Sequence, residues 1–172
     1  MRGKAASVSL LMLLAAGGAV HARAEAPAQQ VVMPDAEKIV LLLRTTLLTL
    51  NDAIQTGNFT VLRDRGAPGF RDANSPARLS QAFADLASRQ IDLAPVSVLS
   101  PQLTEPPGLD QKKGMLHLKG YFPGQPVQIN FEVLYQAVDG RWQLFGLSVQ
   151  PGGPAVQQPK PSAAATKAVK NR

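Results

Sequence analysis

The feature that most restricts the fold is an alternation of apolar and polar residues between residues 114 and 149. Alternation with a period of two is typical of β-strands that bury one face. Two turn-forming pairs, Pro123-Gly124 and Asp139-Gly140, interrupt the alternation. The pattern therefore predicts three antiparallel strands, at about 114–122, 125–137 and 141–149.

Two registers are open for the last pair of strands, and they place different side chains on the buried face. With a three-residue loop, Val138 to Gly140, Val133 lies opposite Phe145. With a two-residue loop, Asp139-Gly140, every partner in the last strand moves by one residue and changes face. The three-residue loop separates apolar from polar side chains better, so we expect it. In the first hairpin we expect Leu118 opposite Ile129. The predicted apolar wall consists of Leu116, Leu118, Phe122, Val127, Ile129, Phe131, Val133, Phe145, Leu147 and Val149.

Helical periodicity precedes these strands. Pro34-Asp35 predict the start of a helix that continues to about Thr56, where Gly57 ends it. Ser75-Pro76 is a typical N-cap and first-turn pair, and it predicts a helix to about Gln90. Apolar stripes predict that both helices pack on a core; they contain Ala36, Ile39, Val40, Leu43, Leu47, Leu50 and Ile54 in the first helix, and Leu79, Ala82, Phe83 and Leu86 in the second.

The segment between the helices and the sheet is expected to be irregular. Residues 91–103 contain Pro95 and Pro101, and proline restricts a strand to the edge of a sheet. We therefore expect an edge strand there, followed by a loop over residues 104–114. The order of elements predicts an α+β domain over residues 34–150, with its helices before the sheet.

The first 24 residues have the pattern of an export signal. Arg2 and Lys4 form a positive start, an apolar run follows from Val8 to Val20, and Ala22-Arg23-Ala24 supplies the small residues of a cleavage site. Val20-His21-Ala22 is a slightly earlier alternative site. The run is shorter than the roughly 20 residues that span a bilayer. We therefore expect removal of residues 1–24, a short leader at 25–33, and a periplasmic or secreted protein.

The formal net charge of +6 comes from the two ends of the chain. Residues 25–150 carry eleven basic and twelve acidic side chains, so the composition of the domain gives no reason to expect nucleic-acid binding. Residues 151–172 mix Pro, Ala, Gln and Lys without an aromatic residue, which predicts a disordered basic tail. Its four basic groups are widely spaced, so we expect at most weak contact with an anionic envelope surface.

Several short motifs follow one another along residues 34–150. They are Gly57-Asn58-Phe59 with Leu62, Ala67-Pro68-Gly69-Phe70-Arg71, Ser75 with Leu79, Phe83 and Leu86, and Gly140-Arg141-Trp142-Gln143-Leu144 followed by Gly146-Leu147-Ser148-Val149. Together with the order of elements, they resemble the nuclear transport factor 2-like superfamily. That superfamily includes ketosteroid-isomerase-like and polyketide-cyclase-like enzymes and many exported domains without catalysis. The resemblance implies a curved antiparallel sheet, wrapped as a cone around the long N-terminal helix, with a pocket at its open end.

The sequence offers few groups for catalysis. The absence of cysteine excludes disulfides, thiol nucleophiles and cysteine-ligated metals. Once the signal is removed, His117 is the one histidine left, which excludes a multi-histidine metal site. His117 alternates with Leu116 and Leu118, so it lies on the polar face of its strand, and we expect no catalytic triad. Glycine-rich phosphate-binding motifs do not occur. We therefore expect no catalytic residue, no metal and no cofactor.

The two faces of the sheet carry the candidate binding residues. The face toward the helices is apolar until the strands end, where Tyr135, Gln143 and Arg141 form a candidate pocket rim, with Tyr135 and Gln143 side by side. On the outer face the predicted register gathers Met115, Leu134, Trp142 and Leu144. Because superfamily members commonly pair through this face, we expect these four residues to form a homodimer or partner interface.

Three functions remain open. The first, which we expect, is an exported, non-enzymatic domain that binds an apolar small molecule or a partner protein. The second is a ketosteroid-isomerase-like lyase, isomerase or hydrolase, in which Tyr135 donates a hydrogen bond to a developing oxyanion and Glu132 or Asp139 acts as acid or base. The third is a structural homodimer whose core is filled by its own side chains. The residues that line the largest cavity distinguish these functions.

Overall fold

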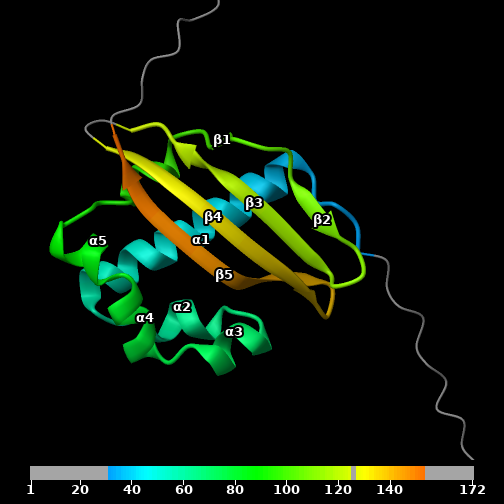
Figure 1. The fold of residues 1–172 in the computed structure, drawn as a ribbon, viewed down its shortest axis with the longest axis horizontal. Coiled ribbons are helices and arrows are strands. Elements are labelled where there is room, and N and C mark those ends of the chain that lie inside the picture. The colour runs from blue at the N-terminus through cyan, green and yellow to red at the C-terminus, as the bar shows by residue number, and fades with distance from the viewer. Residues whose placement is uncertain (1–30, 125–126, 154–172) are drawn as a thin grey trace, which may run out of the picture.

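A five-stranded antiparallel sheet forms one layer of the protein, and its helices lie on one face and beside one edge (Figure 1). The computed structural model describes residues 31–124 and 127–153, so the expected export signal, most of the leader and most of the tail lie outside it. The predicted α+β class is confirmed. The strand order is β1-β3-β4-β5, with β2 also paired to β3. The strands are β1 (Gln102–Leu103), β2 (Gly108–Asp110), β3 (Met115–Phe122), β4 (Gln128–Val138) and β5 (Arg141–Gly152).

Helix α1 (Ala36–Thr56) crosses behind the strands in the view of Figure 1. It begins where the Asp35 side chain accepts a hydrogen bond from the backbone N–H of Lys38 at 2.7 Å. It ends at Gly57, whose φ of 70° is the left-handed conformation that glycine adopts without strain. These ends match the prediction. Ile39, Leu43, Leu47 and Leu50, all from the predicted stripe, are buried in the core.

The remaining helices are short and lie beside the β5 edge (Figure 1). The expected helix from Ser75 to Gln90 is divided at Phe83, whose φ of −106° departs from helical geometry. The Phe83 ring is buried and stacks on Phe59, with 6.3 Å between centroids, so packing of this ring accompanies the break. The elements are α2 (Thr60–Asp64), α3 (Pro68–Ala73), α4 (Pro76–Ala82) and α5 (Ala84–Ser88).

The expected edge strand at residues 91–103 is mostly replaced by a 3₁₀ turn, η1 (Ala94–Ser97). Pro95 is suited to the first turn of a helix, where its missing N–H costs nothing. Leu93 and Val96, three residues apart, are both buried, as a 3₁₀ spacing allows. Among the residues described, none of the helices combines the length and apolarity needed to cross a membrane.

The observed β4–β5 hairpin corrects the predicted register. Asp139 (φ 48°) and Gly140 (φ 72°) form the two-residue loop, so Val138 pairs with Arg141. Further along, the partner changes from Tyr135↔Leu144 to Leu134↔Gly146, which leaves Phe145 as an extra, bulged residue. The bulge explains why a single regular register could not describe the whole hairpin.

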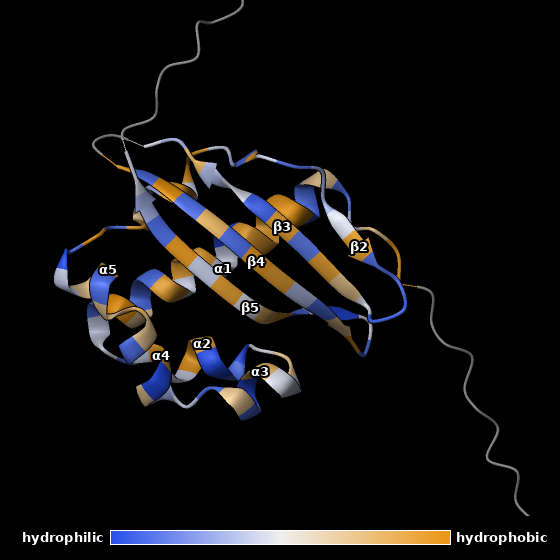
Figure 2. Cartoon of the chain, viewed as in Figure 1, coloured by the Kyte–Doolittle hydropathy of each residue, from blue (hydrophilic) through white to orange (hydrophobic). Residues whose placement is uncertain are grey.

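The two-residue loop and the bulge together change which side chains face the helices. Val133 lies opposite Leu147, and not opposite Phe145 as predicted. Leu144 is buried, whereas Phe145 is 38% exposed and leaves the predicted apolar wall. In the first hairpin Leu118 lies opposite Val133 rather than Ile129. That difference is an even number of residues, so the buried face there is unchanged. Figure 2 shows the resulting alternation of hydrophobic and hydrophilic residues along the strands.

Both ends of β5 have further contacts that the sequence did not predict. Pro151 and Gly152, expected in the tail, continue the strand and pair with Ile129 and Gln128. Near the other end, Gly66 forms a parallel bridge with Leu144, and the Ala67 N–H donates to the Leu144 carbonyl at 2.7 Å. The segment before α3 therefore covers part of the free edge of the sheet.

Candidate functional site

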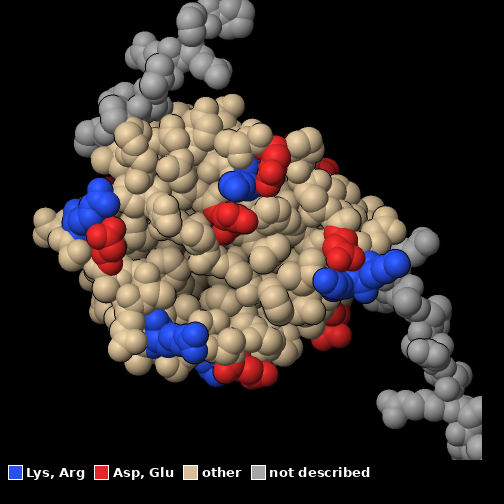
Figure 3. All heavy atoms as spheres, in the orientation of Figure 1, with Lys and Arg blue, Asp and Glu red and all other residues tan. Residues whose placement is uncertain are grey.

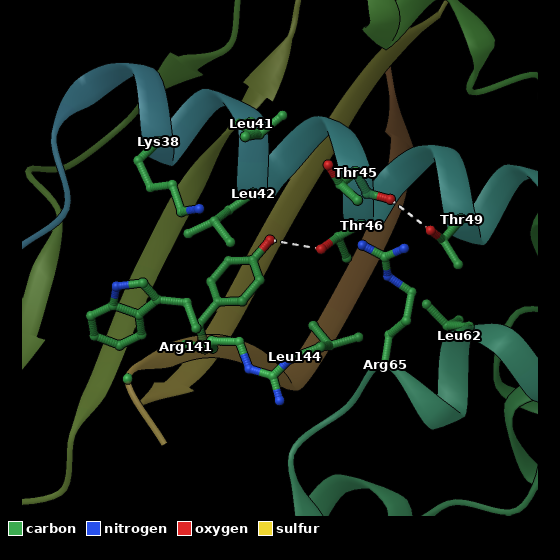
Figure 4. Close-up of a pocket in the computed structure, with 13 residues that line it drawn as sticks. Lys38, Leu41, Leu42, Thr45, Thr46, Thr49, Leu62, Arg65, Arg141 and Leu144 are labelled. Carbon is green, nitrogen blue, oxygen red and sulfur yellow. Dashed lines mark hydrogen bonds between the residues drawn. The ribbon is translucent and has the colours of Figure 1, made fainter. Parts of the chain in front are cut away.

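A cavity of about 330 Å³ lies between the first half of α1 and the hairpin end of β4 and β5. This size is near the lower limit for small-molecule pockets. Its apolar wall combines side chains from the helix, from α2 and from the last strand: Leu41, Leu42, Leu62, Trp142 and Leu144. We call this space the α1–sheet pocket (Figure 4).

The polar side of the α1–sheet pocket is formed by Tyr135 and by threonines of α1. The Tyr135 hydroxyl and Thr46 Oγ1 are 2.8 Å apart and hydrogen bonded, and either oxygen can donate (Figure 4). Thr45 and Thr49 also line the space. Because Tyr135 is almost fully buried, desolvation raises the pKa of its hydroxyl far above the ordinary range. The Thr46 hydrogen bond and the positive charge of Arg65 oppose this rise only in part, so the hydroxyl stays neutral.

Lys38, Arg65 and Arg141 form the basic rim of the pocket. They come from α1, from the residue that ends α2 and from the start of β5. In the view of Figure 4 their charged ends lie apart from one another, that of Arg65 near Thr46 and Thr49 and that of Arg141 near Leu144. All three residues are exposed. Within the described part of the chain, none of them forms a salt bridge, and the lining contains no Asp, Glu or His. The rim is therefore a concentration of positive charge without a carboxylate beside it.

Ultraviolet titration is expected to show that the Tyr135 hydroxyl stays protonated in the folded protein at a pH where an exposed phenol would ionise. Above the usual tyrosine pKa of about 10, only the unfolded chain can release the Tyr135 proton easily, because burial raises the pKa in the fold. The stability contributed by this group is therefore complete below about pH 10 and decreases as the pH rises further. At pH 11 the folded wild type and the variant Tyr135→Phe should show the same tyrosinate absorbance, because the buried Tyr135 hydroxyl keeps its proton. A larger tyrosinate absorbance in the folded wild type than in Tyr135→Phe would contradict the assignment.

The structure places only part of the predicted pocket rim at the α1–sheet pocket. Tyr135 and Arg141 line the α1–sheet pocket, but Gln143 does not. Because the hairpin loop has two residues, Gln143 pairs with Gln136 instead of lying beside Tyr135. The proposed acids are also elsewhere. The Glu132 carboxylate accepts a hydrogen bond from His117 Nε2 at 2.9 Å on the outer face, and Asp139 is exposed in the hairpin loop.

The predicted partner interface is corrected in the same way. Leu144 is 4% exposed and faces the core, and Trp142 is partly buried and lines the α1–sheet pocket. Met115 and Leu134 do lie on the outer face, where Phe145 joins them around an open hollow of about 810 Å³. Figure 3 shows charged atoms in separate groups on this face, with uncharged surface between them. The two-residue loop turns Trp142 and Leu144 away from the outer face, and the bulge leaves Phe145 on it.

Lys38 and Arg65 were missed by the sequence analysis. For Lys38 a signal existed: Lys38, Leu42, Thr45 and Thr49 recur at helical spacing and mark a second, more polar face of α1. Arg65 had no comparable signal, because its position depends on how the short helix α2 packs beside α1.

Comparisons with protein-family models, with curated proteins and with solved structures find no match to this chain. The function must therefore be argued from the pocket itself.

Proposed function

We propose that this protein is an exported, non-enzymatic domain that binds a small molecule in the α1–sheet pocket. The observation that carries the proposal is the lining: apolar walls around an open volume of about 330 Å³, with a neutral Tyr135 hydroxyl as the main buried polar group. Export is supported by the pattern of residues 1–24. Membership of the nuclear transport factor 2-like superfamily, with a sheet curved as a cone around α1, is part of the same proposal.

Catalysis of the ketosteroid-isomerase-like kind receives less support from the same lining. Such a reaction needs an acid or base close to the group that stabilises the oxyanion. Of the two carboxylates considered, Glu132 contacts His117 and Lys119 on the outer face, and Asp139 lies in the exposed loop. The Tyr135 hydroxyl is hydrogen bonded to Thr46. A core filled only by its own side chains also fits poorly with an open volume.

Binding can be tested with 1-octanol as an uncharged probe, because Trp142 is the single tryptophan of the chain and lines the pocket. Octanol should change the Trp142 fluorescence in a saturable way. The variant Thr45→Phe places a ring in the pocket and should abolish the change. The matched control is Thr60→Phe, at an exposed residue outside the lining, which should bind as the wild type does. If folded Thr45→Phe binds octanol unchanged, the proposal is wrong.

As a second candidate, we propose that two copies pair through the outer face of the sheet. Met115, Leu134 and Phe145 supply apolar contact around the open hollow. His117, Lys119 and Glu132 bring both signs of charge to the same face, so a twofold arrangement can place opposite charges together. Leu134→Asp should then convert a dimer into a folded monomer, as measured by light scattering.

A further inference from the structure

The basic rim of the α1–sheet pocket indicates more about the ligand than its apolar walls do. Lys38, Arg65 and Arg141 reach one pocket from three separate elements. Three like charges around one cavity repel one another, and the cavity walls between them exclude part of the solvent that would screen them. The arrangement therefore favours a bound anion.

Nearby acids do not neutralise this rim within the described structure. Asp64, next to Arg65 in the chain, forms a salt bridge with Arg63 at 2.9 Å. Glu37, next to Lys38, lines a different surface depression with Arg44. Asp139, two residues before Arg141, is in the exposed hairpin loop and outside the pocket lining. The three cations are thus left to face a ligand.

We propose that the ligand is a small amphipathic monoanion, such as a carboxylate with an aliphatic or aromatic body. This inference rests on the proposed function of the pocket. The apolar body lies against Leu42, Leu62 and Trp142, and the oxyanion lies at the rim. Arg65 and Arg141 hold it because a guanidinium can donate two parallel hydrogen bonds to a carboxylate, and Lys38 adds a third positive charge.

The pocket also limits the size of the ligand. A volume of about 330 Å³ accommodates one short chain or one small ring system. The rim residues are exposed, so the anionic group stays partly hydrated while the body is buried. Partial hydration avoids the large free-energy cost of burying a charge completely.

The experiment compares three probes that share one apolar chain: octanoate, 1-octanol and octylammonium. Binding is followed by Trp142 fluorescence at low ionic strength. Octanoate should bind at least about tenfold more tightly than octanol, because charge-assisted hydrogen bonds are the stronger kind. Octylammonium should bind most weakly. The preference for octanoate should decrease as salt is added, because the rim is exposed.

Variants of the rim separate the charge effect from the apolar one. Arg65→Gln and Arg141→Gln should each weaken octanoate binding more than octanol binding, so that the preference for octanoate falls. Arg78→Gln is the matched control, since Arg78 is exposed on α4 and outside the pocket lining. It should keep the full preference.

The outcomes distinguish the inference from the proposed function. If octanol binds in the pocket but octanoate binds no more tightly, the anionic ligand class is wrong and the binding function stands. If neither probe binds, both are wrong. Vesicles of phosphatidylglycerol test whether the rim instead recognises an anionic membrane surface. If the vesicles bind through the same two arginines and octanoate does not compete with them, the inference is overturned.

Discussion

Val133→Asp is expected to unfold the domain, whereas Leu134→Asp is expected to leave it folded. Val133 is fully buried between Leu118 and Leu147, and the next side chain along β4 points to the opposite face. An unpaired buried carboxylate costs several kcal/mol, a large part of the roughly 5–15 kcal/mol that stabilises an ordinary domain. Circular dichroism and thermal unfolding of the two variants measure the contrast.

The same pair of variants tests the second proposed function. Leu134 lines the outer hollow, so an aspartate there meets water in a monomer and an apolar partner in a dimer. Light scattering should show a smaller particle for Leu134→Asp only if the wild type pairs through this face. An unfolded Leu134→Asp protein would contradict our description of the outer face as free.

Thiol labelling is expected to separate Leu144→Cys from Phe145→Cys by about a hundredfold or more in rate, because a buried thiol reacts only after local or global opening. The natural chain contains no cysteine, so each variant carries one thiol. Leu144 is 4% exposed and Phe145 is 38% exposed. The thiol at position 145 should react quickly in the native protein, and the thiol at 144 should react slowly. If the thiol at position 144 reacted faster than the thiol at 145, the result would contradict the observed pairing and favour the register with the three-residue loop.

The sequence predicted the helix α1 and the three long strands well, because their patterns extend over many residues. Asp35, Gly57 and the stripe from Ile39 to Leu50 set the ends and the buried face of α1. The alternation from residue 114 onward similarly located the strands. Signals of this kind average over many positions, so one exception does not displace them.

The bulge could not be predicted, because it depends on a single inserted residue. Asp139-Gly140 favours the two-residue loop, which alone would turn Leu147 and Val149 to the outer face. The two-residue loop brings Leu144 inward, and one extra residue at Phe145 restores the inward faces of Leu147 and Val149. The prediction of the candidate site contained the most errors, because Trp142, Gln143 and Leu144 all lie between the loop and the bulge. Arg65 was missed because its place at the rim depends on tertiary packing.

The contact between residues 66–67 and β5 has a consequence for the behaviour of the protein at high concentration. An exposed strand edge offers unpaired N–H and C=O groups that can template pairing with another chain. Here Gly66 bridges to Leu144, and Ala67 occupies the carbonyl of that same residue. At the opposite edge the strands β1 and β2 are short, and short edge strands are poor templates. Pairing with another chain is therefore obstructed at the hairpin end of β5 and disfavoured at the opposite edge, which leaves the later part of β5 as the stretch of edge open to such pairing.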